Sequence, residues 1–210
     1  MNPDLMNLRR RTLLACAPAL LSFPSGASAA PGLGQRVPDL QGTDVSGRTV
    51  RLSDFRGRHV VLEWTNPGCP YVQKHYGSGN VQALQAEARR QGVVWLTVNS
   101  TADGSGDFLT PSQMARWQAG QKAEPSFTLM DESGELGRAL GARSALHFFI
   151  LNPRGELLYA GGIDSIPSHK AEDIPRATNY VRQGLAEALA GQPLSVPASR
   201  PYGCPITYRG

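Results

Sequence analysis

Cysteine is scarce in this chain. Its 210 residues include three cysteines, Cys16, Cys69 and Cys204, and no two of them form a Cys-x-x-Cys motif. Disulfide exchange between two thiols of one short motif is therefore excluded. A chain of this length is expected to bury a full hydrophobic core within one domain, so disulfides are not obligatory for folding.

The sequence also has no long apolar run and, after residue 29, no segment where charges of a single sign are concentrated. No stretch approaches the roughly 20 apolar residues that a membrane-spanning helix needs, and the longest candidate, residues 13–23, is broken by Pro18. The formal net charge is +4, of which residues 1–29 hold about +2. The remaining charges are interspersed without a basic stripe, which argues against nucleic acid as a partner.

The first residues have the pattern of an export signal. Arginines at 9–11 form a basic region, an apolar stretch follows, and an A-x-A cleavage site ends at Ala29. We therefore predict a signal peptide over residues 1–29 and a periplasmic or secreted mature protein. Arg10-Arg11 resembles a twin-arginine signal, which leaves two export routes open. Cys16 leaves with this segment.

The remaining residues predict one domain between two short end segments. Residues 30–36 are small and rich in Gly and Pro, which predicts a flexible leader. The domain spans residues 37–191, and residues 192–210 form a Pro-rich tail that carries Cys204.

Strands and helices alternate along the domain. Buried strands are predicted over residues 59–65, 93–98 and 126–130, and a hairpin over 146–151 and 156–160. Helices are predicted after Cys69, from an N-cap at Asn80, from a capping box at Thr110, over 134–140, and from Pro175 to a C-cap at Gly191. This order predicts an α/β sandwich with a mixed central sheet.

Cys69 lies where a buried strand turns into a helix. The first N–H groups of a helix have no partner within it, and the helix dipole places partial positive charge there. Both features favour the thiolate, which is the reactive form of cysteine. The sequence therefore points to redox chemistry at Cys69.

Cys69 and Cys204 are the two cysteines left in the mature chain. In an oxidising compartment, two cysteines and no others suggest a pair. A disulfide between them would close a loop of about 135 residues, for which chain entropy predicts roughly 4–5 kcal/mol of stabilisation.

These features together resemble the thioredoxin-fold superfamily, on its peroxiredoxin-like side (alkyl hydroperoxide reductase and thiol-specific antioxidant, or redoxin). The resemblance covers residues 37–191 and depends on residues 45–57, the strand and turn to Cys69-Pro70, and residues 148–156. It looks closest to a secreted bacterial subgroup with one cysteine in the active turn and a second in a Pro-Tyr-Gly-Cys tail, here residues 201–204. The resemblance implies a three-layer α/β/α sandwich.

The chain departs from that family at several positions. Val72 occupies the place of the second thiol of a thioredoxin motif, and Asn66 occupies the place of a peroxiredoxin threonine. Leu146 stands where the thioredoxin fold has a cis-proline. A cis bond before a non-proline residue costs roughly 2.5–4 kcal/mol, so this bond is predicted to be trans and the pocket altered.

The resemblance also implies roles for four residues. Cys69 would be the nucleophile, with a structural cysteine as the alternative. Cys204 would be a resolving thiol that condenses with a sulfenic acid at Cys69, or a permanent structural disulfide partner. Glu63 would be a buried acid that assists proton transfer, or an exposed glutamate. Arg143 is the candidate cation that stabilises the thiolate and polarises a peroxide.

Other residues favour ordinary structural readings. Lys74 and His75 are predicted to be solvated helix residues, with a contribution to the positive potential near Cys69 as the alternative. Trp64, Trp95, Phe148 and Phe149 are predicted to be core residues. His147 with His75 and Cys69 does not match the Cys-x-x-x-Cys plus His pattern of related copper chaperones, so we expect no metal and no cofactor.

Three functions fit these observations. The first is reduction of a hydroperoxide by Cys69, with regeneration by an external thiol reductant. The second is thiol–disulfide exchange with a protein or small-thiol partner. The third is a non-catalytic module held by a Cys69–Cys204 disulfide. A tail packed rigidly over the active turn would favour the third, and a mobile tail would favour a resolving role.

Overall fold

The computed structural model describes residues 30–209, so the predicted signal peptide lies outside the described residues. These residues form a seven-stranded sheet with the strand order β2-β1-β5-β4-β3-β6-β7. The strands are β1 Gln41–Asp44, β2 Thr49–Arg51, β3 Val60–Trp64, β4 Val94–Asn99, β5 Phe127–Met130, β6 Phe148–Leu151 and β7 Leu157–Gly161. The helices are η1 Leu52–Phe55, α1 Pro70–Gly77, α2 Asn80–Arg90, α3 Pro111–Gly120, α4 Glu135–Leu140, η2 Ala171–Arg176 and α5 Tyr180–Leu189.

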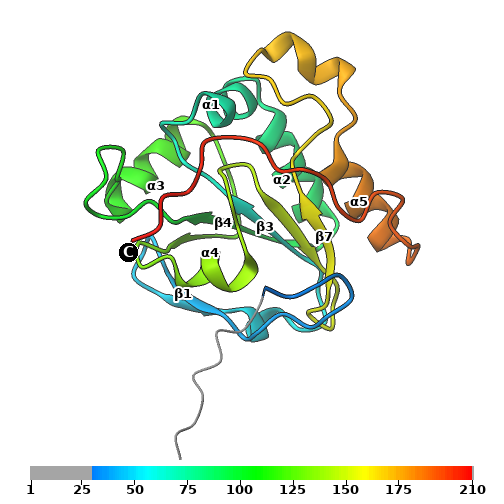
Figure 1. Cartoon of the computed structure of the whole chain (residues 1–210). Helices are drawn as coiled ribbons and strands as arrows, with labels where there is room; N and C mark the ends of the chain where they lie inside the picture. Colours follow the sequence, from blue (N-terminus) through cyan, green and yellow to red (C-terminus); the bar gives the residue numbers. More distant parts are fainter. Residues whose placement is uncertain (1–29, 210) are drawn as a thin grey trace, which may run out of the picture.

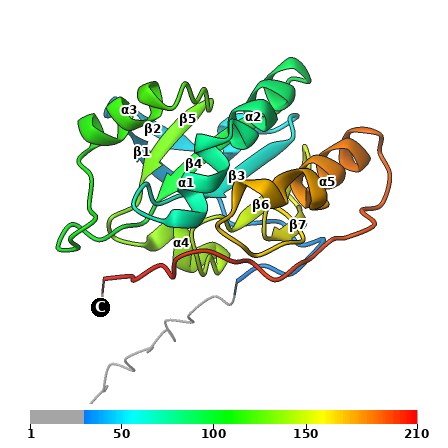
Figure 2. The ribbon, with the colours of Figure 1, turned by 90° about the horizontal axis from the view of Figure 1, so that it is seen from above.

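The sheet is mixed and lies between two layers of helices (Figures 1 and 2). Strand β4 is parallel to both β3 and β5, whereas β6 is antiparallel to β3 and β7 is antiparallel to β6. Helices α1, α2 and α5 pack on one face, and η1 and α4 pack on the other. The α/β sandwich predicted from the sequence is therefore confirmed.

Central strand β3 is buried on both faces, as a strand between two helical layers must be. Val60, Leu62 and Trp64 belong to the core on the α4 side. Val61 belongs to the core on the α1 side, together with Cys69. Glu63 lies two residues after Val61 on the strand, so its side chain projects toward the same face of the sheet, the one that carries Cys69.

Several predicted helix ends are confirmed and two are shifted. The capping box at Thr110 is present, with Pro111 in the first turn of α3. The N-cap of α2 is Gly79 in the left-handed conformation, and Asn80, predicted as the N-cap, is the first helical residue. Its amide is instead held by His75, at 2.8 Å.

The closing helix begins later than predicted. Pro175 lies inside the short 3-10 helix η2, and α5 starts at Tyr180 with Asn179 as its N-cap. The Asn179 side chain accepts a hydrogen bond from the Arg182 N–H at 2.9 Å, which supplies a start signal that the apolar pattern did not show. Gly191 has φ +69° just after the C-cap Ala190, where a left-handed residue is favourable.

The N-terminal segment predicted as a flexible leader, residues 30–36, lies alongside the start of β7. The Gly34 N–H donates to the Leu157 carbonyl at 2.8 Å, and the Leu157 N–H donates to the Gln35 carbonyl at 2.9 Å. These bonds satisfy backbone groups that composition alone gave no reason to pair.

The C-terminal tail crosses one end of the sandwich (red in Figure 1). It first pairs with the edge strand β7 through a bridge between Ala160 and Ala198. It then reaches the loop before β6, where Ser144 pairs with Pro205. Within residues 30–209, no helix is long and apolar enough to cross a membrane.

Candidate functional site: the Cys69–Cys204 disulfide

Cys69 is the N-cap of α1, as the sequence predicts, and Pro70 occupies the first helical turn. Asn66 shapes the turn that precedes it. The Asn66 carbonyl accepts a hydrogen bond from the Cys69 N–H at 3.0 Å, and its side-chain oxygen accepts one from the Gly68 N–H at 2.9 Å. As the N-cap, Cys69 lies at the positive end of the helix. It is only 1% exposed, so it is also shielded from bulk water.

Cys69 and Cys204 form a disulfide, with their Cα atoms 5.8 Å apart. The pairing predicted from the cysteine count is therefore confirmed. The Cys204 N–H donates a hydrogen bond to the Cys69 sulfur, with the nitrogen and the sulfur 3.1 Å apart. Cys204 is a half-buried residue, whereas Cys69 is buried, so the two residues differ in their access to solvent.

The backbone around Cys204 is paired with the loop before β6. The Ala145 N–H donates to the Cys204 carbonyl at 2.9 Å, and the Ile206 N–H donates to the Arg143 carbonyl at 3.1 Å. Gly203 has φ +127°, and a Cβ there would overlap the Ala145 carbonyl. The tail therefore pairs with residues 143–145 through an isolated antiparallel bridge, and glycine at 203 permits this close approach.

Leu146, the residue at the usual cis-proline position, is fully buried and has φ +62°. Residues 30–209 contain no cis peptide bond, which agrees with the trans bond predicted here. The Leu146 N–H donates to the Trp64 carbonyl at 2.7 Å. This bond ties the loop that receives the tail to the end of β3, from which the Cys69 turn emerges.

Glu63 is completely buried on the α1 side of β3, so the alternative of an exposed glutamate is wrong. Tyr76 and Trp95 each donate a hydrogen bond to its carboxyl at 2.8 Å, and Thr97 lies at 3.4 Å. Burial raises the pKa of Glu63 to about 7, because desolvation outweighs the hydrogen bonds that favour the carboxylate. A group with this pKa can take up or release a proton near neutral pH.

Arg143 carries its side chain on the surface. Within the described residues, its guanidinium makes no hydrogen bond or ion pair, and it lines a surface pocket with His147 and Phe149. The structure brings its backbone carbonyl, but not its guanidinium, into contact with the tail that carries Cys204.

Lys74 and His75 are buried, and their prediction as solvated residues is wrong. The Lys74 ammonium donates to the Ser168 carbonyl at 3.0 Å and lies 3.9 Å from the Asp164 carboxylate. His75 Nε2 lies 3.0 Å from the Tyr202 hydroxyl and 3.7 Å from Asp164. Burial lowers the pKa of His75 to about 3, with the Lys74 charge as a second cause, so the imidazole is neutral.

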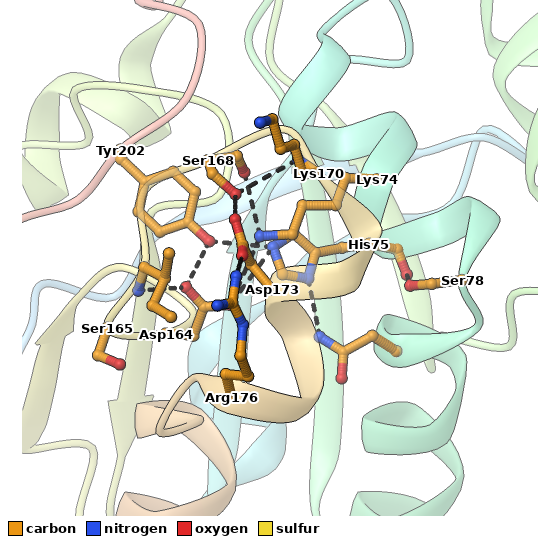
Figure 3. Close-up of polar contacts among 12 residues, drawn as sticks. Lys74, His75, Ser78, Asp164, Ser165, Ser168, Lys170, Asp173, Arg176 and Tyr202 are labelled. Carbon is orange, nitrogen blue, oxygen red and sulfur yellow. Dashed lines mark hydrogen bonds and ion pairs between the residues drawn. The ribbon is translucent and has the colours of Figure 1, made fainter.

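This buried polar cluster (Figure 3) brings together segments that no local pattern connects. Asp164 follows β7, and Tyr202 belongs to the tail, two residues before Cys204. Sequence reasoning did not identify Asp164, because a single acid after a Gly-Gly pair gives no signal of its own. Tyr202 appeared only as part of the Pro-Tyr-Gly-Cys tail.

A small polar cavity of about 40 Å³ adjoins the disulfide. The residues that line it include Cys204, Ala145, Thr65, Asn66 and Ser100. The buried Thr65 hydroxyl makes no hydrogen bond within the described residues. This space is large enough for a molecule the size of water or hydrogen peroxide.

The predicted aromatic core residues are confirmed, since Trp64, Trp95, Phe148 and Phe149 are all at most 1% exposed. His147 packs on Phe149 with ring centroids 4.3 Å apart, and burial lowers its pKa to about 4. The part of the chain that the structure describes contains no group of three or more His, Cys, Asp or Glu that could hold a metal.

Solved structures with the same architecture come from several bacteria. An uncharacterized conserved protein from Geobacillus kaustophilus is 24% identical with a TM-score of 0.71, and the match covers 85% of this chain and 93% of that one. A hypothetical protein from Sinorhizobium meliloti 1021 is 19% identical with a TM-score of 0.73, over 86% and 97% of the two chains.

A third similar structure carries a functional name. This protein from Chlorobium tepidum, provisionally named thiol:disulfide interchange protein DsbE, is 20% identical with a TM-score of 0.58, over 76% of this chain and 99% of that one. At such identities the likeness shows the fold, which is the thioredoxin-like α/β fold that the sequence predicted. A comparison with curated proteins finds no match.

The sequence itself shows the family. The model of the Redoxin family matches residues 33–175, which is most of the chain and includes β1 to β7, Glu63 and Cys69. The match ends before the tail, so it does not include Cys204, whose pairing with Cys69 the structure shows. The chain belongs to the Redoxin family.

Proposed function

We propose that this protein is a thiol–disulfide oxidoreductase whose redox centre is the Cys69–Cys204 pair. The observation that carries the proposal is the disulfide itself, which joins a buried cysteine at a helix N-terminus to a half-buried cysteine on the tail. The Redoxin domain and the similar structure named as a thiol:disulfide interchange protein support it.

The two sulfurs suit different steps of exchange. An incoming thiolate attacks the sulfur of Cys204, the more exposed of the two residues, the Cys69–Cys204 bond breaks, and Cys69 leaves as a thiolate. The position of Cys69 at the N-terminus of α1 stabilises that leaving group. A second thiolate of the partner then attacks the mixed disulfide at the partner's own sulfur, which releases Cys204.

The net reaction moves two electrons. The partner's two thiols become a disulfide, and the Cys69–Cys204 disulfide becomes two thiols. The same steps in reverse reduce a partner disulfide, and the relative reduction potentials set the direction.

Glu63 is proposed to exchange protons with Cys69. Its carboxyl projects toward the same face of the sheet, is buried, and has a pKa raised to about 7 by desolvation. A carboxyl with this pKa can take the proton of the Cys69 thiol and return it to the thiolate.

Reduction of hydroperoxides is the second candidate function, and the small cavity beside Cys204 favours it. The Cys69 thiolate would attack the O–O bond, release water or an alcohol, and become a sulfenic acid. Cys204 would then condense with it, expelling water, and an external dithiol would reduce the disulfide. In this reaction Arg143 is proposed to turn toward Cys69 and stabilise the thiolate.

A purely structural disulfide is the remaining alternative. The tail is packed against the domain on both sides of Cys204, which by itself favours a structural bond. Structural disulfides resist glutathione, with potentials typically below about −300 mV. We also propose, from the N-terminal sequence, that the protein acts in the periplasm or outside the cell, where both kinds of disulfide persist.

The test is disulfide reduction by the mature protein. Reduction of insulin by dithiothreitol is followed in the presence of wild type, Cys69→Ser and Cys204→Ser, and consumption of hydrogen peroxide is followed in parallel. Exchange requires that wild type accelerate insulin reduction and that either serine variant abolish turnover. Acceleration of peroxide consumption alone would replace exchange by the second candidate, and inactivity of wild type in both assays would leave the structural disulfide.

A further inference from the structure

The tail that carries Cys204 has an attachment to the domain that does not depend on the disulfide. The Tyr202 hydroxyl donates a hydrogen bond to Asp164 Oδ1 at 2.7 Å and lies 3.0 Å from His75 Nε2 (Figure 3). Both partners are buried, with Asp164 4% exposed and His75 not exposed at all. Tyr202 is separated from Cys204 by a single residue, Gly203.

The polar groups around Tyr202 form one continuous chain of donors and acceptors. The Asn80 amide lies 2.8 Å from His75 Nδ1, so that nitrogen accepts while Nε2 donates to the Tyr202 oxygen. The Tyr202 hydroxyl in turn donates to Asp164, which also accepts from the Ile166 N–H at 3.1 Å. Every member therefore has a partner, as a buried polar network requires.

Charge within this cluster is also balanced. The Asp164 carboxylate is accompanied by the buried Lys74 ammonium at 3.9 Å, and the Lys74 ammonium donates to the Ser168 carbonyl. A hydrogen bond to a charged group is stronger than one between neutral groups. The bond from Tyr202 to Asp164 is therefore stronger than an average hydrogen bond, and it joins the tail to the segment after β7, whereas the contact of Tyr202 with His75 joins the tail to α1.

Ring contacts hold the Tyr202 side chain in place. The Tyr71 ring, on the first turn of α1, meets the Tyr202 ring edge to face with centroids 5.7 Å apart. The backbone at Gly162 lies against the same ring. Together with the hydrogen bonds, these contacts fix the position from which the chain reaches Cys204.

We propose that Tyr202 is a positioning residue, which holds the Cys204 thiol beside Cys69 after the disulfide opens and thereby sets the reduction potential of the pair. When two thiols stay docked, each is present at the other at high effective concentration, and their disulfide is correspondingly difficult to reduce. An undocked tail loses that advantage. Tyr202 acts through the tail backbone and touches neither sulfur.

The experiment is a redox titration of the purified protein in glutathione buffers. Reduction of the Cys69–Cys204 disulfide consumes two glutathione thiols and forms one glutathione disulfide, and the free thiols are counted by alkylation and mass spectrometry. Wild type is compared with Tyr202→Phe, which removes one hydroxyl. Tyr71→Phe is the matched control, because it removes the hydroxyl of the neighbouring ring, which makes no hydrogen bond within the described residues.

We expect Tyr202→Phe to lower the effective concentration of the pair about tenfold, which for a two-electron couple is about 30 mV toward easier reduction. Tyr71→Phe should stay within twofold of wild type. A Tyr202→Phe value within twofold of wild type would overturn the proposal, because the tail would then be held by its other contacts.

Hydrogen exchange in reduced wild type keeps the test decisive even if Tyr202→Phe fails to fold. The proposal requires that the Ala145 and Ile206 amides, which bond tail and loop, remain protected after reduction. Their free exchange, with β3 amides still protected, would show that the tail leaves when the disulfide opens and would overturn the proposal.

This inference relies on the proposed function only in treating the disulfide as one that opens. The titration needs no partner protein, so the two can fail separately. If the protein shows no exchange activity but its reduction potential changes in Tyr202→Phe, the proposed function is contradicted and the inference about Tyr202 is not. If the protein catalyses exchange but its reduction potential is unchanged in Tyr202→Phe, the inference about Tyr202 is contradicted and the proposed function is not.

Discussion

Tyr76 on α1 donates a hydrogen bond to the buried carboxyl of Glu63 on β3, at 2.8 Å. This bond crosses from the helix that begins at Cys69 to the strand that precedes it. Burial raises the pKa of both groups, that of Glu63 to about 7 and that of Tyr76 well above its usual range. The site therefore contains an acid that is largely neutral below pH 7 directly under the helix that begins at Cys69.

Glu63 makes the stability of the protein depend on pH. Because its pKa is raised from 4.5 to about 7, the folded state binds this proton more tightly than the unfolded state does. Folding is therefore opposed increasingly as pH rises from about 4.5, by up to about 3 kcal/mol above pH 7. Glu63→Gln cannot ionise, so its stability relative to wild type should increase between pH 5 and pH 8.

Urea unfolding of the oxidised protein at several pH values measures this effect. Glu124→Gln, at an exposed position, is the control and should run parallel to wild type. A constant difference between Glu63→Gln and wild type from pH 5 to pH 8 would contradict the raised pKa. It would also remove the argument that Glu63 exchanges protons with Cys69.

His75 acts in the opposite direction. Its pKa is lowered from 6.5 to about 3 by burial and by the Lys74 charge. Between these pH values the imidazole is protonated in the unfolded state and neutral in the folded state. Stability that is present above pH 6.5 is lost as pH falls, by about 2 kcal/mol at pH 5. The stability of wild type relative to His75→Gln should therefore shrink between pH 7 and pH 5.

The same unfolding series checks this second dependence. His169→Gln, on the exposed loop near Tyr71, is the matched control, and its difference from wild type should not vary with pH. If His75→Gln kept a pH-independent difference as well, the imidazole would have to be accessible to protons in the folded protein.

Gly203 is predicted to be intolerant of a side chain. Its φ of +127° is unfavourable for other residues, and a Cβ would overlap the Ala145 carbonyl. Gly203→Ala should lower the free energy of unfolding by about 1–3 kcal/mol and loosen the tail around Cys204. Gly104→Ala, where no atom lies within 4 Å of the added Cβ, should be close to neutral. Equal stability of the two variants in urea unfolding would contradict the close contact.

Removal of the disulfide should destabilise the protein. The bond joins residues 135 positions apart, and its loss is expected to cost about 2–5 kcal/mol, of which the chain-entropy figure given above is the upper end. Cys204→Ser, compared with wild type by urea unfolding, should show this loss, and dithiothreitol should lower wild type to nearly the same value. A variant as stable as oxidised wild type would contradict this prediction and mean that the disulfide adds no net stability to the folded protein.

The sequence predicts the sheet and the Cys69 turn well because both depend on local patterns. Residues 59–65 are apolar enough to mark a strand buried on both faces, and Cys69-Pro70 marks the start of a helix. The sequence also predicts the Cys69–Cys204 pair, since an oxidising compartment leaves these two cysteines with few alternatives.

The buried cluster around Lys74 and His75 could not be predicted in the same way. On a helix of eight residues, charged side chains are usually solvated, and nothing nearby in sequence indicates otherwise. They are buried because the segment after β7, with Asp164, and the tail, with Tyr202, cover that helix from 89 to 128 residues away. Such long-range coverage has no periodic signature in a single sequence.

One measurement tests the central claim of exchange at Cys69–Cys204 most directly. Oxidised wild type is mixed with a short peptide that carries two cysteines, quenched with acid after seconds to minutes, and mapped by mass spectrometry. The proposed exchange predicts a transient mixed disulfide between the peptide and Cys204, with Cys69 free, followed by an oxidised peptide and two free protein thiols. An intact Cys69–Cys204 disulfide after hours, in folded protein and excess peptide, would contradict exchange and make the bond structural.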